Sequence, residues 1–526
     1  MEEKYLSENT SRTMGKDAQR NNILAAKLIA DIVKTTLGPR GMDKMLVDSS
    51  NNITVTNDGV TILEEMEIDH PAAKMMVEIA KTQENEVGDG TTTVALLAGK
   101  LLENAEYLLD KKIHPTVIVK GYRIAAKKCL EILNEISQPI KSREILKSLA
   151  MTAMTGKGAE GNKEYLSELI VQAIEQISSE SITDLDNIKI EKISGEKTED
   201  SQLIKGIVLN KERSNQEMPT QVENAKILLI DFPLEIKGPE TETKIEISNP
   251  EQLQSFIESE ERYLKSITEK IIGSGANVVF CQKGIDDVAQ YYLAKAGIMA
   301  FRRIMKSDLE KLSRATSGKI ISNLNDLSRE QLGSAKRVDE IKHGDSNYTY
   351  VTGCENPRAV TILIRGGTSH VIDETERAIK DGLGDVSTAL KSGKVVAGGG
   401  AVEIELARRL RQFAQTVSGR EQLALEEFAK SLESIPETLA ENAGLDPIEI
   451  ITQLKKAHDS AFTNYGLNLF TDRIEDTFQA GIIEPLKVKT QAISSASELA
   501  TMILRIDDVL ISKPKQEKES KFDGLD

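Results

Sequence analysis

A short run of glycine, aspartate and threonine, Gly88-Asp89-Gly90-Thr91-Thr92-Thr93, has the residue types of a phosphate-binding loop. It directly precedes the apolar run 94–98, so we predict that a helix begins here. Glycines let the backbone approach an anion, threonines can cap the helix, and the first-turn N–H groups and the helix dipole attract negative charge. The run by itself is also compatible with an ordinary capped turn.

Asp89 places a carboxylate among these donors. A carboxylate beside phosphates is repelled unless a cation lies between them. The combination therefore indicates Mg²⁺ that bridges Asp89 and a nucleotide.

A nucleotide hydrolase also needs groups that orient or deprotonate water and that sense the terminal phosphate. Asp58, Lys157 and Asp381 are candidates, and each has a simpler interpretation. Asn57-Asp58-Gly59 is a favoured hairpin turn, Lys157 lacks the rest of a Walker A motif, and most acids on the helical stretch 372–390 are solvated.

Two further glycine segments could bring backbone close to a ligand. Residues 38–41 (GPRG) follow a helical pattern, and Gly398-Gly399-Gly400 lies between a short apolar run and a helix expected from Ala401. A helix-terminating turn and a flexible interdomain joint, respectively, explain them equally well.

Composition limits the class of protein. At 526 residues the chain is long enough for about three domains. It has 83 acidic against 67 basic residues, a net charge of −16, no tryptophan and 4% aromatic residues. These features argue against nucleic acid as a general partner.

The remaining signals favour a cytoplasmic protein. Cys129, Cys281 and Cys354 are widely spaced and odd in number, which suggests neither a disulfide framework nor a zinc site. No signal-peptide core and no run of about 18 apolar residues occurs, so we expect no secretion and no membrane partner. The charged stretch 513–526 is predicted to be disordered.

Periodicity divides the chain into three regions. Helical patterns occupy 18–37, where Leu24, Leu28 and Ile32 with their neighbours predict a buried stripe, and also 71–147 and 401–510. The segment 53–63 predicts a hairpin around Asn57-Asp58-Gly59. Between the helical regions, apolar runs at 227–230, 278–280, 298–301, 320–321 and 361–364 alternate with helical stretches at 285–296 and 308–316, which predicts an α/β domain.

The return of helical texture after the α/β region predicts that both chain ends share one domain. A polar, turn-rich excursion at 237–250 leads into a long helix with Leu264, Ile267 and Ile271 on one face. Periodicity favours a surface helix over a mobile lid.

Taken in order, these segments resemble the group II chaperonins, the archaeal thermosome and eukaryotic cytosolic chaperonin family, over nearly the whole chain. The matching stretches are TTLGPRGMDKMLVD (35–48), TNDGVTIL (56–63), KTQENEVGDGTTTVALLAG (81–99), TGKGAE (155–160), ANVVFCQKGIDDVAQYYLAKAGI (276–298), VVAGGGAVEIELA (395–407), LAENAGLDPIEI (439–450) and IIEPLKVKTQAI (482–493).

The resemblance implies a multidomain α and α/β chaperonin fold. Its domains would be a helical equatorial ATP-binding domain (1–146 and 401–526), a small intermediate domain (147–214 and 364–400) and an α/β apical substrate-binding domain (215–363). It also implies that the excursion at about 237–272 is a helical protrusion serving as a lid, which reverses the preference from periodicity.

Site roles follow from the same resemblance. Asp89 would bind Mg²⁺, and Asp58 and Asp381 would flank the attacking water, while Lys157 senses the γ-phosphate. The implied nucleotide contacts are phosphate contacts at Gly88, Gly90, Thr91, Thr92 and Thr93, a second wall at Gly38 and Pro39, and ribose contacts at Gly399 and Glu484.

The implied function is an ATP- and Mg²⁺-dependent chaperonin ATPase. Such a subunit joins the same or paralogous subunits in a double ring and encloses unfolded protein when hydrolysis closes the lid. The alternative is a structural or regulatory ring subunit with weak ATPase, and a third reading is a monomeric small-molecule enzyme.

Two departures from the family pattern bear on these roles. Gly382 and Gly384 follow Asp381 within its helix and are expected to weaken it by roughly 1 kcal/mol each, which affects how Asp381 is positioned. The tail 513–526 lacks Gly-Gly-Met repeats.

Overall fold

The structure is a computed structural model that describes residues 10–47, 51, 53–156, 160–178, 184–236 and 250–512. The chain forms two compact units. Unit 1 combines Met1–Gly156 with Ser392–Asp526, and unit 2 is Lys157–Lys391. Residues 147–156 and 392–400 thus lie in unit 1, and the division into three domains stays a prediction.

Unit 1 is mainly helical. Its helices are α1 (Gly15–Lys34), α2 (Gly59–Glu65), α3 (Pro71–Val87), α4 (Thr91–Asp110), α5 (Pro115–Ile136), α6 (Arg143–Met154), α12 (Ala401–Ala414), α13 (Glu421–Asn442), α14 (Pro447–Asp459) and α15 (Leu486–Ile503). Its strands are β1 (Thr10–Met14), β2 (Lys44–Val47), β3 (Ile53–Thr56), β4 (Gln138–Pro139), β15 (Lys394–Ala397), β16 (Tyr465–Asn468), β17 (Arg473–Asp476), β18 (Ile483–Pro485) and β19 (Asp508–Ser512).

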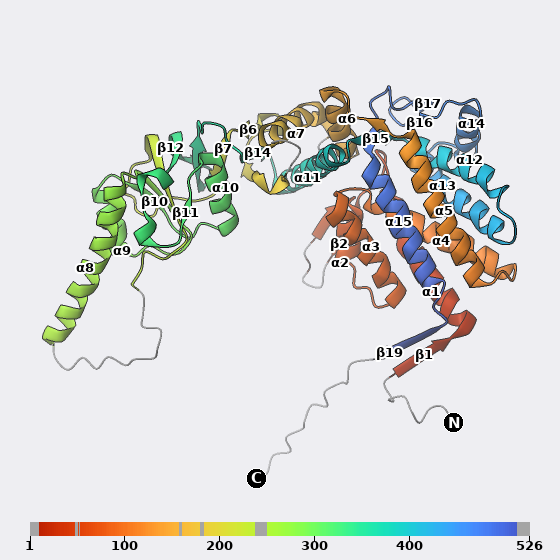
Figure 1. Cartoon of the computed structure of the whole chain (residues 1–526), viewed down its shortest axis with the longest axis horizontal. Helices are drawn as coiled ribbons and strands as arrows, with labels where there is room; N and C mark the ends of the chain where they lie inside the picture. Colours follow the sequence, from red (N-terminus) through yellow and green to blue (C-terminus); the bar gives the residue numbers. More distant parts are fainter. Residues whose placement is uncertain are drawn as a thin grey trace, which may run out of the picture. The chain divides into compact units, whose positions relative to one another are not determined.

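Helix α4 lies at the centre of unit 1, where it contacts α1, α3, α13 and α15 (Figure 1). Small residues allow the close approach. A Cβ on Gly99 of α4 would lie 2.4 Å from the Cβ of Ala30 on α1, and a Cβ on Gly121 of α5 would lie 2.4 Å from the Cβ of Ala424 on α13. These helices are therefore fixed at short distances around one apolar core.

The predicted helix at 18–37 is confirmed as α1, but its buried stripe is not the predicted one. Ile29 and Val33 are buried as expected, whereas Leu24 and Leu28 are 55% and 53% exposed. The buried face is centred on Ala26 and Ala30 because only small side chains fit against α4. The size of the side chains determines which face of the helix is buried, and the spacing of apolar residues does not show that size.

The predicted hairpin around Asn57-Asp58-Gly59 is wrong. Strand β3 ends at Thr56, and Asp58 is the N-cap of α2. The hairpin in this region lies upstream, where β2 pairs antiparallel with β3. Asp58 caps the helix by accepting a hydrogen bond from the Thr61 N–H, a local alternative that the turn pattern did not distinguish.

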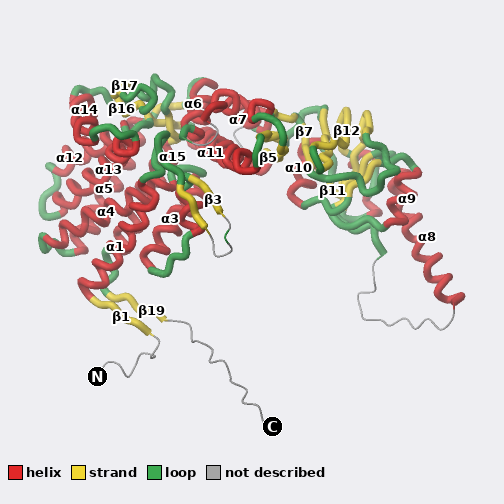
Figure 2. Tube along the Cα trace, turned by 180° about the vertical axis from the view of Figure 1, so that it is seen from behind, coloured by secondary structure: helices red, strands yellow, loops and turns green. Residues whose placement is uncertain are grey.

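The first and last described strands of the chain pair with each other. Strand β1 runs antiparallel to β19, and Arg12 forms an ion pair with Asp508 at 2.6 Å (Figures 1 and 2). Both ends of the described chain therefore lie in unit 1.

Unit 2 is an α/β assembly. Its helices are α7 (Lys163–Ile177), α8 (Pro250–Ser274), α9 (Asp287–Lys295), α10 (Lys306–Thr316) and α11 (Ser369–Ser392). Its strands are β5 (Ile188–Ser194), β6 (Gln202–Ile204), β7 (Gly206–Leu209), β8 (Gln221–Ile230), β9 (Val278–Cys281), β10 (Met299–Phe301), β11 (Ile320–Ile321), β12 (Gly333–His343), β13 (Ser346–Thr352) and β14 (Val360–Gly366).

A seven-stranded mixed sheet forms the core of unit 2 (Figure 2). Strands β10, β9, β8 and β11 are parallel, whereas β12, β13 and β7 continue the sheet in antiparallel order. Alternate residues of β8 face α8 and α9 on one side and α10 on the other. The predicted α/β alternation is confirmed at all five apolar runs, although β14 belongs to a separate sheet with β5 and β6.

Helix α8 packs on the rest of unit 2 through its C-terminal part, whose apolar face was predicted from the sequence. Leu264, Ile267 and Ile271 are buried there. The Tyr292 hydroxyl of α9 donates to Glu261 Oε1 of α8 at 2.9 Å. Residues 237–249 of the predicted protrusion lie outside the described residues, as does the tail 513–526.

Helix α11 carries Asp381 and continues without interruption to Ser392. The two glycines after Asp381, Gly382 and Gly384, are buried within it. The expected weakening does not break the helix, because packing stabilises the glycine backbone there.

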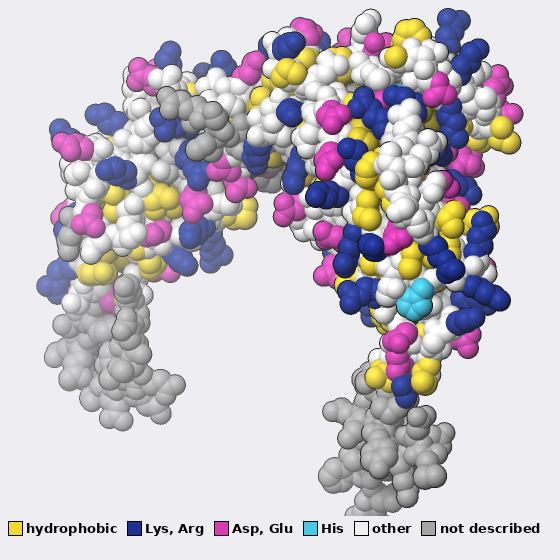
Figure 3. Space-filling view, turned by 45° about the vertical axis from the view of Figure 1, so that its right-hand side comes forward, with side chains coloured by type: hydrophobic (Ala, Val, Ile, Leu, Met, Phe, Trp, Pro, Cys, Tyr) yellow, Lys and Arg dark blue, Asp and Glu magenta, His cyan; other side chains and the backbone are white. Residues whose placement is uncertain are grey.

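Among the described residues, no helix is both long enough and apolar enough to cross a lipid bilayer. On the face shown in Figure 3, acidic and basic side chains are interspersed.

Candidate functional site

The predicted phosphate loop is a tight turn between α3 and α4. Gly88 (φ 81°) ends α3 and donates its N–H to the Glu84 carbonyl at 2.8 Å, and Gly90 (φ 82°) is the N-cap of α4. No side chain caps α4, so the prediction that the threonines cap this helix is wrong. The N–H groups of Thr91, Thr92 and Thr93 therefore remain as donors at the positive end of the helix dipole.

Gln83 fixes this loop against α15. Its buried side-chain amide donates to the Asp89 carbonyl at 2.9 Å and to the Val488 carbonyl at 3.3 Å. A Cβ on Gly90 would lie 2.9 Å from Val488 Cγ1 and 3.0 Å from Gln83 Nε2. The loop requires glycine here both for its positive φ and for lack of space.

Asp58 lies next to the first turn of α4. Its Oδ2 accepts hydrogen bonds from the Thr61 N–H at 2.9 Å and the Thr61 hydroxyl at 2.7 Å. A Cβ on Gly59, the next residue, would lie 2.7 Å from Thr92 Oγ1 and 3.1 Å from the Thr92 nitrogen. The structure thus places the backbone of Asp58-Gly59 directly against the threonine donors.

The Gly38-Pro39 turn is linked through Gly156 to Asn57, the residue before Asp58. A Cβ on Gly156 would lie 2.7 Å from Pro39 Cα and 3.0 Å from the Gly38 carbonyl oxygen. The side-chain amide of Asn57 donates to the Gly156 carbonyl at 2.7 Å. Residues 155–156 therefore approach the site, while Lys157 lies outside the described residues.

The glycine run 398–400 is held on both sides. Gly399 (φ 65°) accepts a hydrogen bond from the Leu467 N–H at 2.8 Å, and the Thr477 hydroxyl donates to the Gly398 carbonyl at 3.0 Å. Gly400 (φ 77°) is the N-cap of α12, which begins at Ala401 as predicted. These bonds argue against a flexible joint, and close approach of a ligand stays a prediction.

Glu484 reaches this glycine run from β18, which pairs with β15. A Cβ on Gly398 would lie 3.0 Å from Glu484 Oε1. The other carboxylate oxygen of Glu484, Oε2, accepts a hydrogen bond from Lys489 Nζ at 2.6 Å. The same ammonium lies 2.9 Å from Glu403 Oε1. Burial raises the pKa of the Glu484 carboxyl, and the charges of Glu403 and Asp89 act in the same direction, against the attraction of Lys489.

Lys489 is charged despite its burial. Desolvation lowers its pKa, but the carboxylates of Glu403 and Glu484 more than offset this and hold the pKa of Lys489 above its ordinary value. The ammonium is therefore a fixed positive charge between two acids.

The structure connects most predicted site residues of unit 1 through short links. Gly38 and Pro39 lie against Gly156, which accepts a hydrogen bond from Asn57, and Gly59 lies against Thr92. Gly90 lies against Val488, and the next residue, Lys489, bonds to Glu484 beside Gly398. Asp381 lies in unit 2, on α11. Sequence reasoning missed Gln83, Glu403 and Lys489. All three lie within the matching stretches 81–99, 395–407 and 482–493, but their contacts include partners remote in sequence, which the stretches do not reveal.

The residues present fit a Mg²⁺–nucleotide better than a metal bound by protein alone. Among the described residues, no group of three or more His, Cys, Asp or Glu side chains could hold a metal ion. Asp89 offers one carboxylate two residues before the uncapped helix α4, and Mg²⁺ typically takes one or two carboxylates and completes its shell with phosphates and water.

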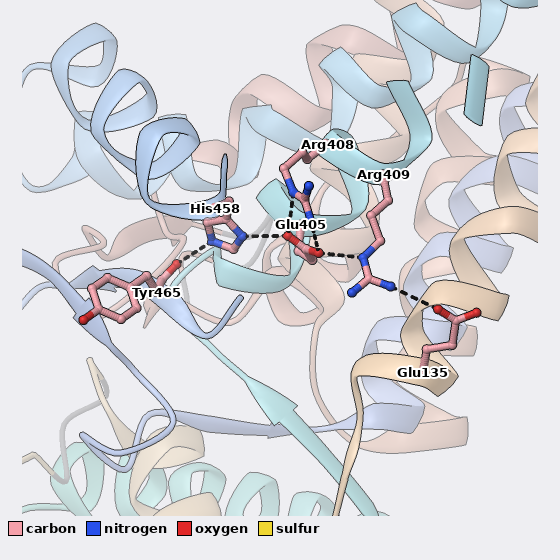
Figure 4. Close-up of polar contacts among 6 residues, drawn as sticks. All are labelled: Glu135, Glu405, Arg408, Arg409, His458 and Tyr465. Atoms are coloured by element: carbon pink, nitrogen blue, oxygen red, sulfur yellow. Dashed lines mark hydrogen bonds and ion pairs between the residues drawn. The ribbon is translucent and has the colours of Figure 1, made fainter. Parts of the chain in front are cut away.

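A separate buried charge network supports the helices behind this site (Figure 4). Glu405 of α12 accepts hydrogen bonds from Arg408 at 2.7 Å, Arg409 at 2.6 Å and His458 of α14 at 3.0 Å. Burial alone would raise the pKa of Glu405, but these three donors outweigh it and hold the pKa well below its usual range. The network ties α12, which begins at the glycine run, to α14.

An open groove of about 760 Å³ lies elsewhere in unit 1, between α5 and α15. Arg123, Lys127, Glu498 and Arg505 contribute its charges. It contains none of the predicted site residues.

Comparison with known proteins identifies the family of this chain. The model of the TCP-1/cpn60 chaperonin family matches residues 29–514. A thermosome subunit of Methanopyrus kandleri is 57% identical over 514 residues, which is 97% of this chain and 94% of the relative. The thermosome subunit alpha of Archaeoglobus fulgidus is 54% identical over 525 residues, 99% of this chain and 96% of the relative. The chain therefore belongs to the TCP-1/cpn60 chaperonin family, within which it is similar to the archaeal thermosome subunits of group II.

Proposed function

We propose that this chain is an ATP-dependent chaperonin subunit that assembles with the same or paralogous subunits into a double ring and encloses non-native protein. The observation that carries the nucleotide part is the packing of Gly59 against the uncapped N-terminus of α4, which begins after Gly90. The similarity to thermosome subunits supports the ring and the clients.

The α4 N-terminus would bind the nucleotide phosphates. The N–H groups of Thr91, Thr92 and Thr93 supply donors, and Gly88 and Gly90 allow the backbone to approach. Mg²⁺, when bound, would neutralise phosphate charge beside Asp89. Gly399 and Glu484 would contact the sugar.

Hydrolysis would require two carboxylates. Asp58 and Asp381 would orient and deprotonate the attacking water, and Lys157 would contact the γ-phosphate. Bringing these groups to the water would couple hydrolysis to a conformational step. Closure of a lid formed by the protrusion at 237–272 would be the mechanical result.

The test is steady-state ATPase of the assembled protein, compared with Asp381→Ala. The matched control is Asp345→Ala, which removes an exposed carboxylate from the turn between β12 and β13. We expect Asp381→Ala to lower turnover by about 100-fold or more without loss of nucleotide binding, while Asp345→Ala leaves it unchanged.

Equal, negligible rates in the wild type and Asp381→Ala would contradict the hydrolase and support the alternative, a nucleotide-binding structural or regulatory ring subunit. Native mass separates both from the third reading. A compact monomer of about 57.9 kDa with bound nucleotide would contradict the ring.

A further inference from the structure

Three charged side chains, of which Glu403 and Lys489 are buried and Glu484 is half-buried, form a cluster beside the glycine run 398–400. Lys489, in the first turn of α15, bonds to Glu484 Oε2 at 2.6 Å and to Glu403 Oε1 at 2.9 Å. Glu403 lies in the first turn of α12, directly after this run, and is 3% exposed. The cluster therefore connects the starts of two helices to the predicted ribose-binding acid.

The cluster has an odd charge balance. One ammonium serves two carboxylates, so the three side chains carry more negative than positive charge in a place where only Glu484 is partly exposed. Glu403 Oε2 is also buried and accepts no hydrogen bond within the described part of the chain. Such an oxygen costs free energy, so stability alone does not account for an acid at position 403.

The geometry gives Glu403 a role in orientation. A lysine ammonium on a flexible four-carbon stem is poorly fixed by one partner, and Glu403 supplies a second partner beside Glu484. Lys489 in turn occupies Oε2 of Glu484, which leaves Oε1 at the glycine run, 3.0 Å from the Cβ position of Gly398. Because Glu403 shares the Lys489 ammonium, the charge of Glu484 is only partly neutralised. Its Oε1 can therefore still accept a hydrogen bond.

We infer that Glu403, acting through Lys489, is a positioning residue that aims Glu484 Oε1 at the vicinal hydroxyls of a ribonucleotide and so sets preference for ribose over 2′-deoxyribose. This inference rests on the proposed nucleotide site and adds a determinant of its sugar specificity.

The experiment measures affinity of the assembled protein for Mg²⁺–ADP and Mg²⁺–2′-deoxyADP by isothermal titration calorimetry, since neither diphosphate is consumed by hydrolysis. The variants are Glu403→Gln, Glu484→Gln and the double variant. Glu498→Gln is the matched control, because it removes an exposed carboxylate from α15, the helix that carries Lys489.

We expect the wild type to prefer ADP by about tenfold. Glu403→Gln should bring the ratio of ADP to 2′-deoxyADP affinity close to one, because it weakens the binding of ADP alone. Its thermal stability should be unchanged or higher. The double variant should lose no more discrimination than Glu484→Gln, and Glu498→Gln should keep the wild-type ratio.

The positioning role would be overturned if Glu403→Gln kept the wild-type ratio of ADP to 2′-deoxyADP affinity. It would also be overturned if the variant bound both diphosphates more weakly by the same factor. A wild type that binds both diphosphates equally would also overturn it while leaving the proposed function intact. A wild type that binds neither diphosphate would refute the nucleotide site itself.

Discussion

Asp58 and Thr61 form a helix cap at the edge of the candidate phosphate site. Oδ2 of Asp58 accepts both the N–H and the hydroxyl of Thr61, at 2.9 and 2.7 Å. One oxygen of the proposed catalytic carboxylate is therefore committed to the start of α2, and chemistry would fall to the other. Capping and catalysis make different demands on this residue.

Variants at Asp58 separate these demands. Asp58→Asn retains a good N-cap but loses the charge, so we expect stability within about 0.5 kcal/mol of wild type and ATPase reduced about 100-fold. Asp58→Ala should show the same loss of activity and a further cost of about 1 kcal/mol in unfolding free energy. Thermal unfolding and steady-state ATPase measure both, and an active Asp58→Asn would contradict the catalytic assignment.

Crowding at Gly90 can be measured against a glycine with the same backbone strain. Gly90 and Gly444 have φ of 82° and 73°, but a Cβ would meet Val488 and Gln83 only at Gly90, since nothing lies within 4 Å of that position on Gly444. We expect Gly444→Ala to cost about 1 kcal/mol and Gly90→Ala about 2 to 4 kcal/mol. Denaturant unfolding of the two variants gives the difference, and equal costs would show that the loop has room to relax.

Gln83 should be essential to the loop although it touches no proposed ligand. Gln83→Leu leaves the carbonyls of Asp89 and Val488 without their shared donor, which should cost about 2 kcal/mol and weaken nucleotide binding. The exposed Gln453 of α14 provides the control Gln453→Leu, which should change neither quantity. If nucleotide affinity in Gln83→Leu equals that of the control, the loop is not held by this amide.

The pKa of Glu405 predicts loss of stability in acid. Because the folded state holds this pKa below its ordinary value of 4.5, the carboxylate contributes stability that is fully present above pH 4.5 and is lost as the pH falls through the folded pKa. Glu405→Gln should cost about 3 kcal/mol at pH 7 by leaving Arg408, Arg409 and His458 without their anion.

The check is the unfolding free energy between pH 7 and pH 3. The deficit of Glu405→Gln relative to wild type should shrink as the pH falls. Glu426→Gln, which removes an exposed acid from α13, should show a small deficit at every pH. A deficit for Glu405→Gln that is constant with pH would mean that the charge of Glu405 does not stabilise the fold.

Sequence periodicity predicted the elements whose signals are local. The helix at 18–37 and the alternation from 227 to 316 are present because apolar spacing and turn residues act within one element. The antiparallel strands β12 and β13 and the buried face of α1 were not predicted, since they depend on partners elsewhere in the chain. Asn57-Asp58-Gly59 was misread because turn and helix cap favour the same residues.

The sequence by itself determined the candidate chemistry of this protein: a turn proposed to bind an anion, a carboxylate proposed to bind Mg²⁺ and a set of motifs that identifies the family. Tertiary structure decided which of these residues share a site. It placed Gly59 against Thr92, Gly156 on Pro39, and Lys489 between Glu403 and Glu484. Short motifs encode backbone conformation locally, whereas contacts between residues hundreds of positions apart arise only when helices pack around a common core.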